Sequence, residues 1–307
     1  MSLVVVGSVA FDSIKSPFGE VEEAIGGSAT YFSTAASYFT DVQLVAVVGE
    51  DFPASVLKDL RDRGVDLAGL ERQPGRTFRW KGFYGEDMNE AQTLDTQLNV
   101  LETFEPKLPE SYRDAEVVFL ANIDPELQLK VVEQMKRPKL IAADTMNFWI
   151  TGKPDALRKT LKRVDLLFVN DAEAQALTGE ANIVKAAQAI KQMGPSRVVI
   201  KRGEYGALFF DKDQVFFAPA FPLDSVHDPT GAGDSFAGGF MGYLTRHGGE
   251  SSPEVFKQAA IVGSVMASFC VERFSLERVR ELDDALIQAR YQSMRALTTF
   301  PEQTLFI

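Results

Sequence analysis

Cysteine is almost absent from this chain of 307 residues, which holds only Cys270. A single cysteine excludes an internal disulfide and fits a reducing compartment such as the cytoplasm. Because Cys270 lies in an apolar run that begins near residue 261, we expect a buried thiol with a structural role.

Positive charge and long hydrophobic runs are also scarce. The chain has 32 Lys and Arg against 43 Asp and Glu, a formal net charge of −11. A nucleic-acid groove needs a basic stripe, so we expect no nucleic-acid partner. No stretch approaches the roughly 18 apolar residues of a membrane helix. The first apolar run ends at Gly7 without a basic region before it, so we expect no signal peptide, no membrane partner and a cytoplasmic location.

The loops that mark three common enzyme classes are missing. No Gly-Lys-Ser or Gly-Lys-Thr occurs, which excludes a Walker phosphate loop. The residue two positions after Ser235 is Ala237 instead of glycine, which excludes a nucleophile elbow. Residues 7–10 follow the first predicted strand without the glycines of a dinucleotide-binding loop, which argues against a Rossmann dehydrogenase.

Strand and helix patterns instead alternate along most of the chain. This order predicts one α/β domain over residues 1–307, with a mostly parallel central sheet covered by helices on both faces. Residues 207–218 predict a hairpin. Apolar runs predict strands at 3–6, 42–48, 65–70, 117–121, 140–144, 166–170 and 198–201. Helices are predicted near 28–38, 54–63, 125–136, 154–164, 171–178, 183–193, 253–271 and 276–294.

Two further segments alternate with period two, which is typical of strands with one exposed face. One is 20–24, and the other is 77–84, where aromatic and basic residues interleave. The second segment is either an ordinary edge strand or a cover over a binding site. In the second case, Phe78, Trp80 or Phe83 would face the ligand.

The most informative stretch runs from Asp228 to Phe240. Pro229 fixes a turn, and we expect Thr230 to cap the helix that follows. Gly231, Ala232 and Gly233 have almost no side chain, so their N–H groups can converge on an anion such as a phosphate. Asp234 then stands in the first helical turn, where a carboxylate beside phosphate is explained if it accepts a proton from an attacking hydroxyl. The alternative is a glycine-rich helix start at which Asp234 only complements the helix dipole.

Other polar residues follow predicted strands, where ligands of open α/β sheets bind. Asp12 could bind two vicinal hydroxyls or make turn hydrogen bonds. Gly26, Gly27 and Ser28 open a helix that includes Tyr31. Asn170 and Glu173 are spaced to face one way, or to form a capping box. The remaining candidates are Lys201, Gly203 and Gly206 at the end of one strand, and Ser264 in a helix rich in small residues.

These motifs, in this order, resemble the ribokinase-like carbohydrate and nucleoside kinases, often called the PfkB family. The resemblance covers nearly the whole chain and implies a Rossmann-like three-layer sandwich with a small β-sheet lid, here from segments near 15–25 and 76–100. It also implies a magnesium-dependent kinase with ATP as co-substrate. One departure concerns the acceptor site, because many members have Asn where this chain has Tyr31. Tyr31 would then be a core residue or a ring that stacks on a base or sugar.

The resemblance implies a role for each candidate. Asp234 would be the base, and Gly231, Ala232 and Gly233 would stabilise the transferring phosphoryl group. Because the transition state is loose, an unshifted Asp234 would suffice. Magnesium would be held by Glu173 through water. The acceptor would contact Asp12, Gly26, Gly27, Ser28 and Tyr31. The nucleotide would contact Asn170, Lys201, Gly203, Gly206, Thr230, Gly231, Gly233 and Ser264.

The acceptor is less specified than the reaction. The aromatic segment and Tyr31 favour an adenosine-like ribonucleoside, with phosphoryl transfer to its hydroxymethyl group. A free monosaccharide such as ribose or fructose is the alternative, as is a nucleotide- or sugar-binding regulator without catalysis. Lids in the family sometimes pair between subunits, which leaves a homodimer through the lid open.

Overall fold

The computed structural model describes residues 1–89, 91–212, 214–249 and 252–301. A nine-stranded sheet forms its body, with strand order β13-β12-β11-β10-β9-β8-β1-β4-β5. The strands from β5 to β11 pair in parallel, and β12 and β13 add an antiparallel edge, which confirms the mostly parallel sheet. Their bounds are β1 Leu3–Val6, β4 Val42–Gly49, β5 Val65–Gln73, β8 Val117–Leu120, β9 Leu140–Asp144, β10 Leu166–Asn170, β11 Arg197–Lys201, β12 Ala207–Asp211 and β13 Gln214–Ala218.

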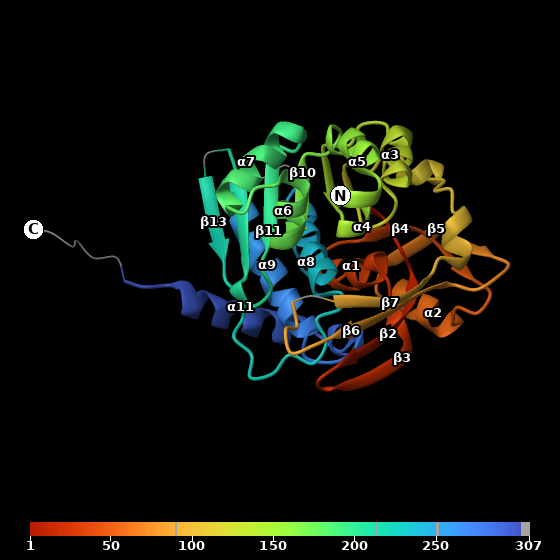
Figure 1. Cartoon of the computed structure of the whole chain (residues 1–307), viewed down its shortest axis with the longest axis horizontal. Helices are drawn as coiled ribbons and strands as arrows, with labels where there is room; N and C mark the ends of the chain where they lie inside the picture. Colours follow the sequence, from red (N-terminus) through yellow and green to blue (C-terminus); the bar gives the residue numbers. More distant parts are fainter. Residues whose placement is uncertain (90, 213, 250–251, 302–307) are drawn as a thin grey trace, which may run out of the picture.

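Helices cover both faces of this sheet (Figure 1). Alternate residues of β1 enter opposite cores: Leu3 and Val5 face α1, α2, α8 and α9, whereas Val4 and Val6 face the helices from α3 to α7. This is the three-layer arrangement expected from the strand and helix order. The helices are α1 Ser28–Ala36, α2 Ala54–Asp62, α3 Pro125–Gln134, α4 Asn147–Gly152, α5 Pro154–Leu161, α6 Asp171–Thr178, α7 Ile183–Met193, α8 Ala232–Arg246, α9 Pro253–Cys270, α10 Glu277–Arg280 and α11 Asp284–Thr298.

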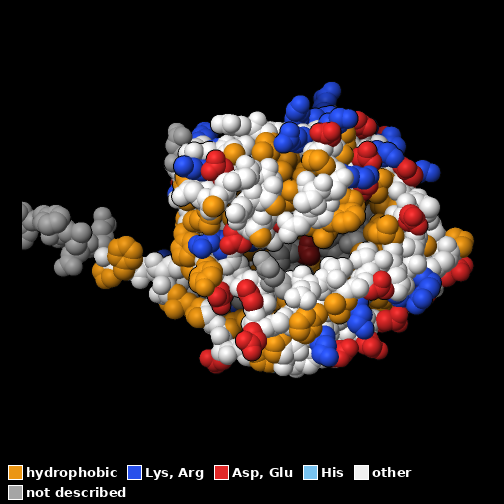
Figure 2. All heavy atoms as spheres, viewed as in Figure 1, with side chains coloured by type: hydrophobic (Ala, Val, Ile, Leu, Met, Phe, Trp, Pro, Cys, Tyr) orange, Lys and Arg blue, Asp and Glu red, His pale blue; other side chains and the backbone are white. Residues whose placement is uncertain are grey.

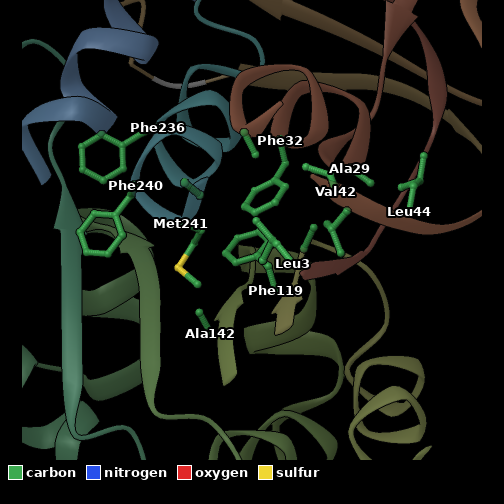
Figure 3. Packing of buried hydrophobic residues seen from close by; sticks show 14 of the residues in the cluster. Leu3, Ala29, Phe32, Val42, Leu44, Phe119, Ala142, Phe236, Phe240 and Met241 are labelled. Carbon is green, nitrogen blue, oxygen red and sulfur yellow. The ribbon is translucent and has the colours of Figure 1, made fainter. Parts of the chain in front are cut away.

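Aromatic side chains fill the space between α1, α8 and the sheet (Figure 3). Phe32 of α1 stacks on Phe119 of β8, with ring centroids 4.2 Å apart. Phe240 of α8 packs edge-on against Phe168 of β10 at 5.2 Å. Burying such rings contributes a large share of the folding free energy and fixes where α8 begins relative to the strand ends.

A second, four-stranded sheet has the order β3-β2-β6-β7. Its strands are β2 Ala10–Ser16, β3 Gly19–Gly26, β6 Phe78–Tyr84 and β7 Ala91–Gln97. Figure 1 shows them gathered at the lower edge of the molecule, apart from the body. The expected lid segments near 15–25 and 76–100 overlap the strands of this sheet, which begins earlier than expected, at Ala10. We call these four strands, residues 10–26 and 78–97, the lid.

The prediction of one continuous helix near the end of the chain was wrong. Instead of one helix over 276–294, the chain forms α10 and α11, separated by a break at residues 281–283. Asp283 causes the second start, because its side chain accepts a hydrogen bond from the Leu286 N–H at 2.8 Å as an N-cap.

Candidate active site

Three parallel strands end in polar residues at one edge of the sheet. Asp144, Asn170 and Lys201 terminate β9, β10 and β11, which are neighbours. The lid and the start of α8 face the same region, and Figure 2 shows the surface hollowed between the body and the lid, with an acidic side chain inside the hollow. The structure therefore brings the expected strand-end residues to one place.

The loop before α8 has the geometry of an anion site. Gly231 is the N-cap of α8 with φ of +75°, a left-handed conformation that favours glycine. A Cβ at Gly231 would lie 2.3 Å from the Tyr31 ring, and one at Gly233 would lie 2.9 Å from Lys201 Nζ. The positive φ and the buried Tyr31 ring require glycine at position 231, whereas a side chain at position 233 would displace the end of the Lys201 side chain. The first N–H groups of α8 have no side-chain caps.

Thr230 does not cap α8, which corrects the expectation from sequence. Its hydroxyl instead donates to the Tyr84 hydroxyl of β6 at 3.2 Å. The turn is shaped by the fully buried Asp228, whose carboxylate accepts from the N–H groups of Thr230 at 2.8 Å and Ser275 at 2.9 Å. Asp228 therefore holds the loop in position without using the N–H groups of α8.

Asp234 belongs to a cluster of carboxylates around one lysine. Lys201 Nζ donates to Asp144 Oδ2 at 2.9 Å and packs against Gly233. Burial raises the pKa of Asp234 to about 8, with Asp144 adding to the rise and Lys201 opposing it. This differs from the unshifted carboxylate expected from sequence. A base whose pKa lies near the working pH accepts a proton more effectively.

The lysine itself stays charged. Burial lowers the pKa of Lys201, but the neighbouring Asp144 and Glu173 carboxylates outweigh that effect and leave it raised. A permanent cation therefore lies beside the loop that precedes α8, residues 228–233, where it can offset phosphate charge.

Asp12, a residue of β2 in the lid, lies beside the backbone that leads into α1. A Cβ at Gly26 would lie 1.8 Å from Asp12 Oδ2, so glycine at this position makes room for the carboxylate. Burial raises the pKa of Asp12 to about 7, although a hydrogen bond from the Gly27 backbone lowers it. Gly27 has φ of +93° and begins α1. Asp12, Gly26 and Gly27 are thus brought together as expected.

Ser28 and Tyr31 have buried side chains. Ser28 Oγ lies 3.1 Å from Ser8 Oγ and donates to the Asn122 carbonyl at 3.2 Å, joining the loops after β1 and β8. Tyr31 is 1% exposed and packs among core side chains of α9. Of the two roles considered for Tyr31, the structure shows the core role, with the ring beneath Gly231.

Asn170 and Glu173 form a reciprocal capping box. Asn170 Oδ1 accepts from the Glu173 N–H, and Glu173 Oε2 accepts from the Asn170 N–H, both at 2.7 Å. Burial raises the pKa of Glu173 to about 7, although Lys201 lowers it. Among the residues that the structure describes, no three His, Cys, Asp or Glu side chains form a ready metal site. The excess of carboxylates near one lysine suits a divalent cation held mainly by phosphates and water.

The segment after β11 is a tight turn. The Arg202 N–H donates to the Gly206 carbonyl at 2.7 Å. Gly203 and Gly206 both have positive φ, and a Cβ at Gly206 would lie 2.2 Å from the Ala218 carbonyl oxygen. These glycines are explained by the turn itself. Ser264 is buried on α9, and its nucleotide contact stays a prediction.

The register of the lid decides which aromatic rings share the face of Asp12. Asp12 pairs with Trp80 in the parallel β2–β6 ladder, and side chains alternate along a strand. Phe78, Trp80 and Tyr84 therefore lie on the face of Asp12, and Phe83 lies on the opposite face. Sequence reasoning did not single out Tyr84, which is 7% exposed and accepts a hydrogen bond from the Thr230 hydroxyl at 3.2 Å. Its position at the end of the alternating segment was the available signal.

A comparison with protein families matches residues 2–278 to the pfkB family carbohydrate kinase model. The chain belongs to the pfkB family. It is 34% identical over 256 residues to the cytidine kinase of Thermococcus kodakarensis, covering 80% of this chain and 89% of that relative. This membership confirms the resemblance seen in the sequence and makes the protein a phosphotransferase that acts on a hydroxyl group of a sugar or nucleoside.

Solved structures of pfkB relatives have the same fold. The Burkholderia thailandensis nucleoside kinase in complex with inosine superimposes with a TM-score of 0.75 at 18% identity, over 96% of this chain and 98% of that one. A putative ribokinase II from E. coli, in complex with ATP and Mg²⁺, gives 0.76 at 17% identity over 96% and 99%. Within the described residues, no helix of this pfkB protein has the length and apolar character to span a membrane.

Proposed function

We propose that this protein transfers the γ-phosphoryl group of ATP to the hydroxymethyl hydroxyl of a ribonucleoside, with magnesium. The observation that carries the proposal is the placement of the Asp234 carboxylate and the uncapped N–H groups of Gly233 and Asp234 at one helix start, beside Lys201. An acceptor hydroxyl near Asp234 would then meet the terminal phosphate at the α8 N-terminus.

Each residue has one task in this mechanism. Asp234 orients the acceptor hydroxyl and receives its proton, and its raised pKa favours that transfer. The N–H groups of Gly231 and Gly233 and the Lys201 ammonium stabilise charge on the transferring group, whereas the Ala232 N–H donates to the Pro229 carbonyl at 3.1 Å. Bound magnesium would supply further neutralisation of phosphate charge, with Glu173 in its outer shell. Asp12 holds sugar hydroxyls through its carboxylate.

Two observations favour a nucleoside over a free sugar. The relative with 34% identity is a cytidine kinase, and it matches most of both chains. In addition, Trp80 lies on the lid face of Asp12, where a ring could stack on a base. We therefore propose a ribonucleoside acceptor and would place cytidine first in the test, followed by adenosine and inosine.

The test is an acceptor panel with ATP and magnesium, in which ADP release is measured. We expect at least one ribonucleoside to exceed ribose and fructose by tenfold or more in kcat/KM. Preference for a monosaccharide would replace the nucleoside assignment, and silence across the panel would favour a binding protein without catalysis.

Replacement of Asp234, the proposed general base, is the most direct single-variant test. Asp234→Asn keeps the side-chain shape but removes the proton acceptor, so kcat should fall about 10²–10⁴-fold while the Kd for ADP changes little. Calorimetric titration with ADP provides the binding measurement. Near-normal kcat in this variant would remove Asp234 from the proposed role.

A further inference from the structure

The lid contacts the anion loop through Tyr84, the last residue of β6. Its ring is 7% exposed, and its hydroxyl accepts a hydrogen bond from Thr230 Oγ1 at 3.2 Å. Thr230 immediately precedes Gly231, the left-handed N-cap of α8. The position of the Thr230 side chain is therefore coupled to the direction of the first free N–H groups.

A second contact joins the turn after β6 to the segment after β11. A Cβ at Gly203 would lie 1.8 Å from Asn89 Oδ1, so the two residues are in direct contact. Glu204 chiefly raises the pKa of the Tyr205 phenol, and Asp87, in the same turn as Asn89, adds to that rise. The end of β6 and the turn after it thus contact both loops that we propose to hold the nucleotide, the one before α8 and the one after β11.

The other lid strands hold the flanks of the same loop. Ser16 Oγ of β2 donates to the His227 carbonyl at 2.8 Å. The hydroxyl of Ser275 donates to the Ile25 carbonyl of β3, and the Ser275 N–H donates to Asp228. Residues 227–230 are consequently attached to the lid on both sides.

We propose that Tyr84 is a positioning residue that links the lid to the anion-binding loop through Thr230. Asp12 and Trp80 pair across β2 and β6, so an acceptor held by Asp12 acts on the strand that carries Tyr84. Binding at one subsite then changes affinity at the other by the same factor, because linkage is reciprocal. The inference rests on the proposed function, since it takes residues 230–233 as the phosphate site.

The first test uses ADP and magnesium without any acceptor, and measures amide hydrogen exchange in peptides from residues 84–97. In the unchanged protein, ADP should slow exchange in this segment severalfold. In Tyr84→Phe, which keeps the ring and removes the hydroxyl, the slowing should be lost. Equal protection in both proteins, or no protection in the unchanged protein, would overturn the link.

The second test is kinetic. Tyr84→Phe should lower kcat about 5–20-fold and leave the Kd of the acceptor, measured without nucleotide, within about twofold, because the loop acts on the transition state. Thr230→Val removes the other partner and should give a similar loss. The double variant should lose no more than either single variant, since both remove one interaction. Additive losses would show that the two residues act separately.

Tyr243→Phe is the matched control. It also removes a phenol hydroxyl, which bonds Gln258 Oε1 at 3.0 Å between α8 and α9, away from the lid. We expect no change in kcat or in lid exchange. If ADP protects the lid and Tyr84→Phe abolishes that protection while no nucleoside is phosphorylated, the link holds and the proposed acceptor fails.

Discussion

The body and the lid are both built from β-strands but are stabilised differently. Every residue of β1 and β8 is buried between two helical layers, whereas every residue of β7 is exposed. The body gains its stability from apolar area removed from water. Within the lid, β7 contributes little such area, whereas β2 buries Phe11 and Ile14.

Polar contacts hold the lid to the body. Arg79 of β6 makes an ion pair with Asp51 of the body at 2.9 Å. Within the lid, it also pairs with Glu23 at 2.8 Å, and its guanidinium lies over the Phe11 ring at 4.9 Å. Thr77, just before β6, donates to the same Asp51 carboxylate. Contacts of this kind contribute roughly 0–1 kcal/mol each near the surface. A lid held in this way can open at low cost, as a covering element over a binding site must.

The largest expected effect distinguishes the two regions by stability. Phe240→Ala removes a ring that contacts Phe168, Phe209 and Phe256 in the body, and should lower the free energy of unfolding by about 3–5 kcal/mol. Leu94→Ala in β7, where the side chain is 57% exposed, is the lid control and should stay within about 0.5 kcal/mol. Chemical denaturation measures both, and equal losses would contradict the comparison.

A lid variant should instead change activity. Asp12→Asn removes a charged acceptor of hydrogen bonds, worth about 1.5–3 kcal/mol, so the KM of the acceptor should rise roughly 10–100-fold. Stability at pH 8 should not fall, since burial raises the pKa of Asp12 and penalises its charged form. Steady-state kinetics measures the change in the KM of the acceptor, and thermal unfolding at pH 8 measures the stability. An unchanged KM would show that Asp12 does not hold the acceptor.

The last prediction concerns how the free energy of unfolding of the ligand-free protein depends on pH. Burial raises the pKa values of Asp12 and Glu173 to about 7, above those of the unfolded chain near 4. Their contribution to stability is complete below pH 4 and is lost as pH rises through 7. We expect the free energy of unfolding to be lower at pH 8.5 than at pH 5, and Asp234, whose pKa burial raises to about 8, adds to this loss. A higher stability at pH 8.5 would contradict these shifts.

Sequence reasoning predicted the body well because its signals are local. Short apolar runs such as 140–143 and 166–169, each followed by a polar residue, favour buried strands in a helix-covered sheet. Gly179 ends α6 in a left-handed conformation, as its sequence position indicates. The family motifs also placed Asp234 and Gly231 at the start of α8. These features depend on neighbours within a few residues.

The sequence by itself determined the α/β body, the family and the glycine-containing loop that opens α8, because periodicity and glycine spacing are properties of short segments. Only the tertiary structure decided that Thr230 bonds Tyr84 instead of capping α8, that Tyr31 lies in the core, and that burial raises the pKa of Asp234. Each of these depends on groups far apart in the chain. Which partner a hydroxyl reaches, and how much water a carboxylate loses, is settled when the lid and body meet.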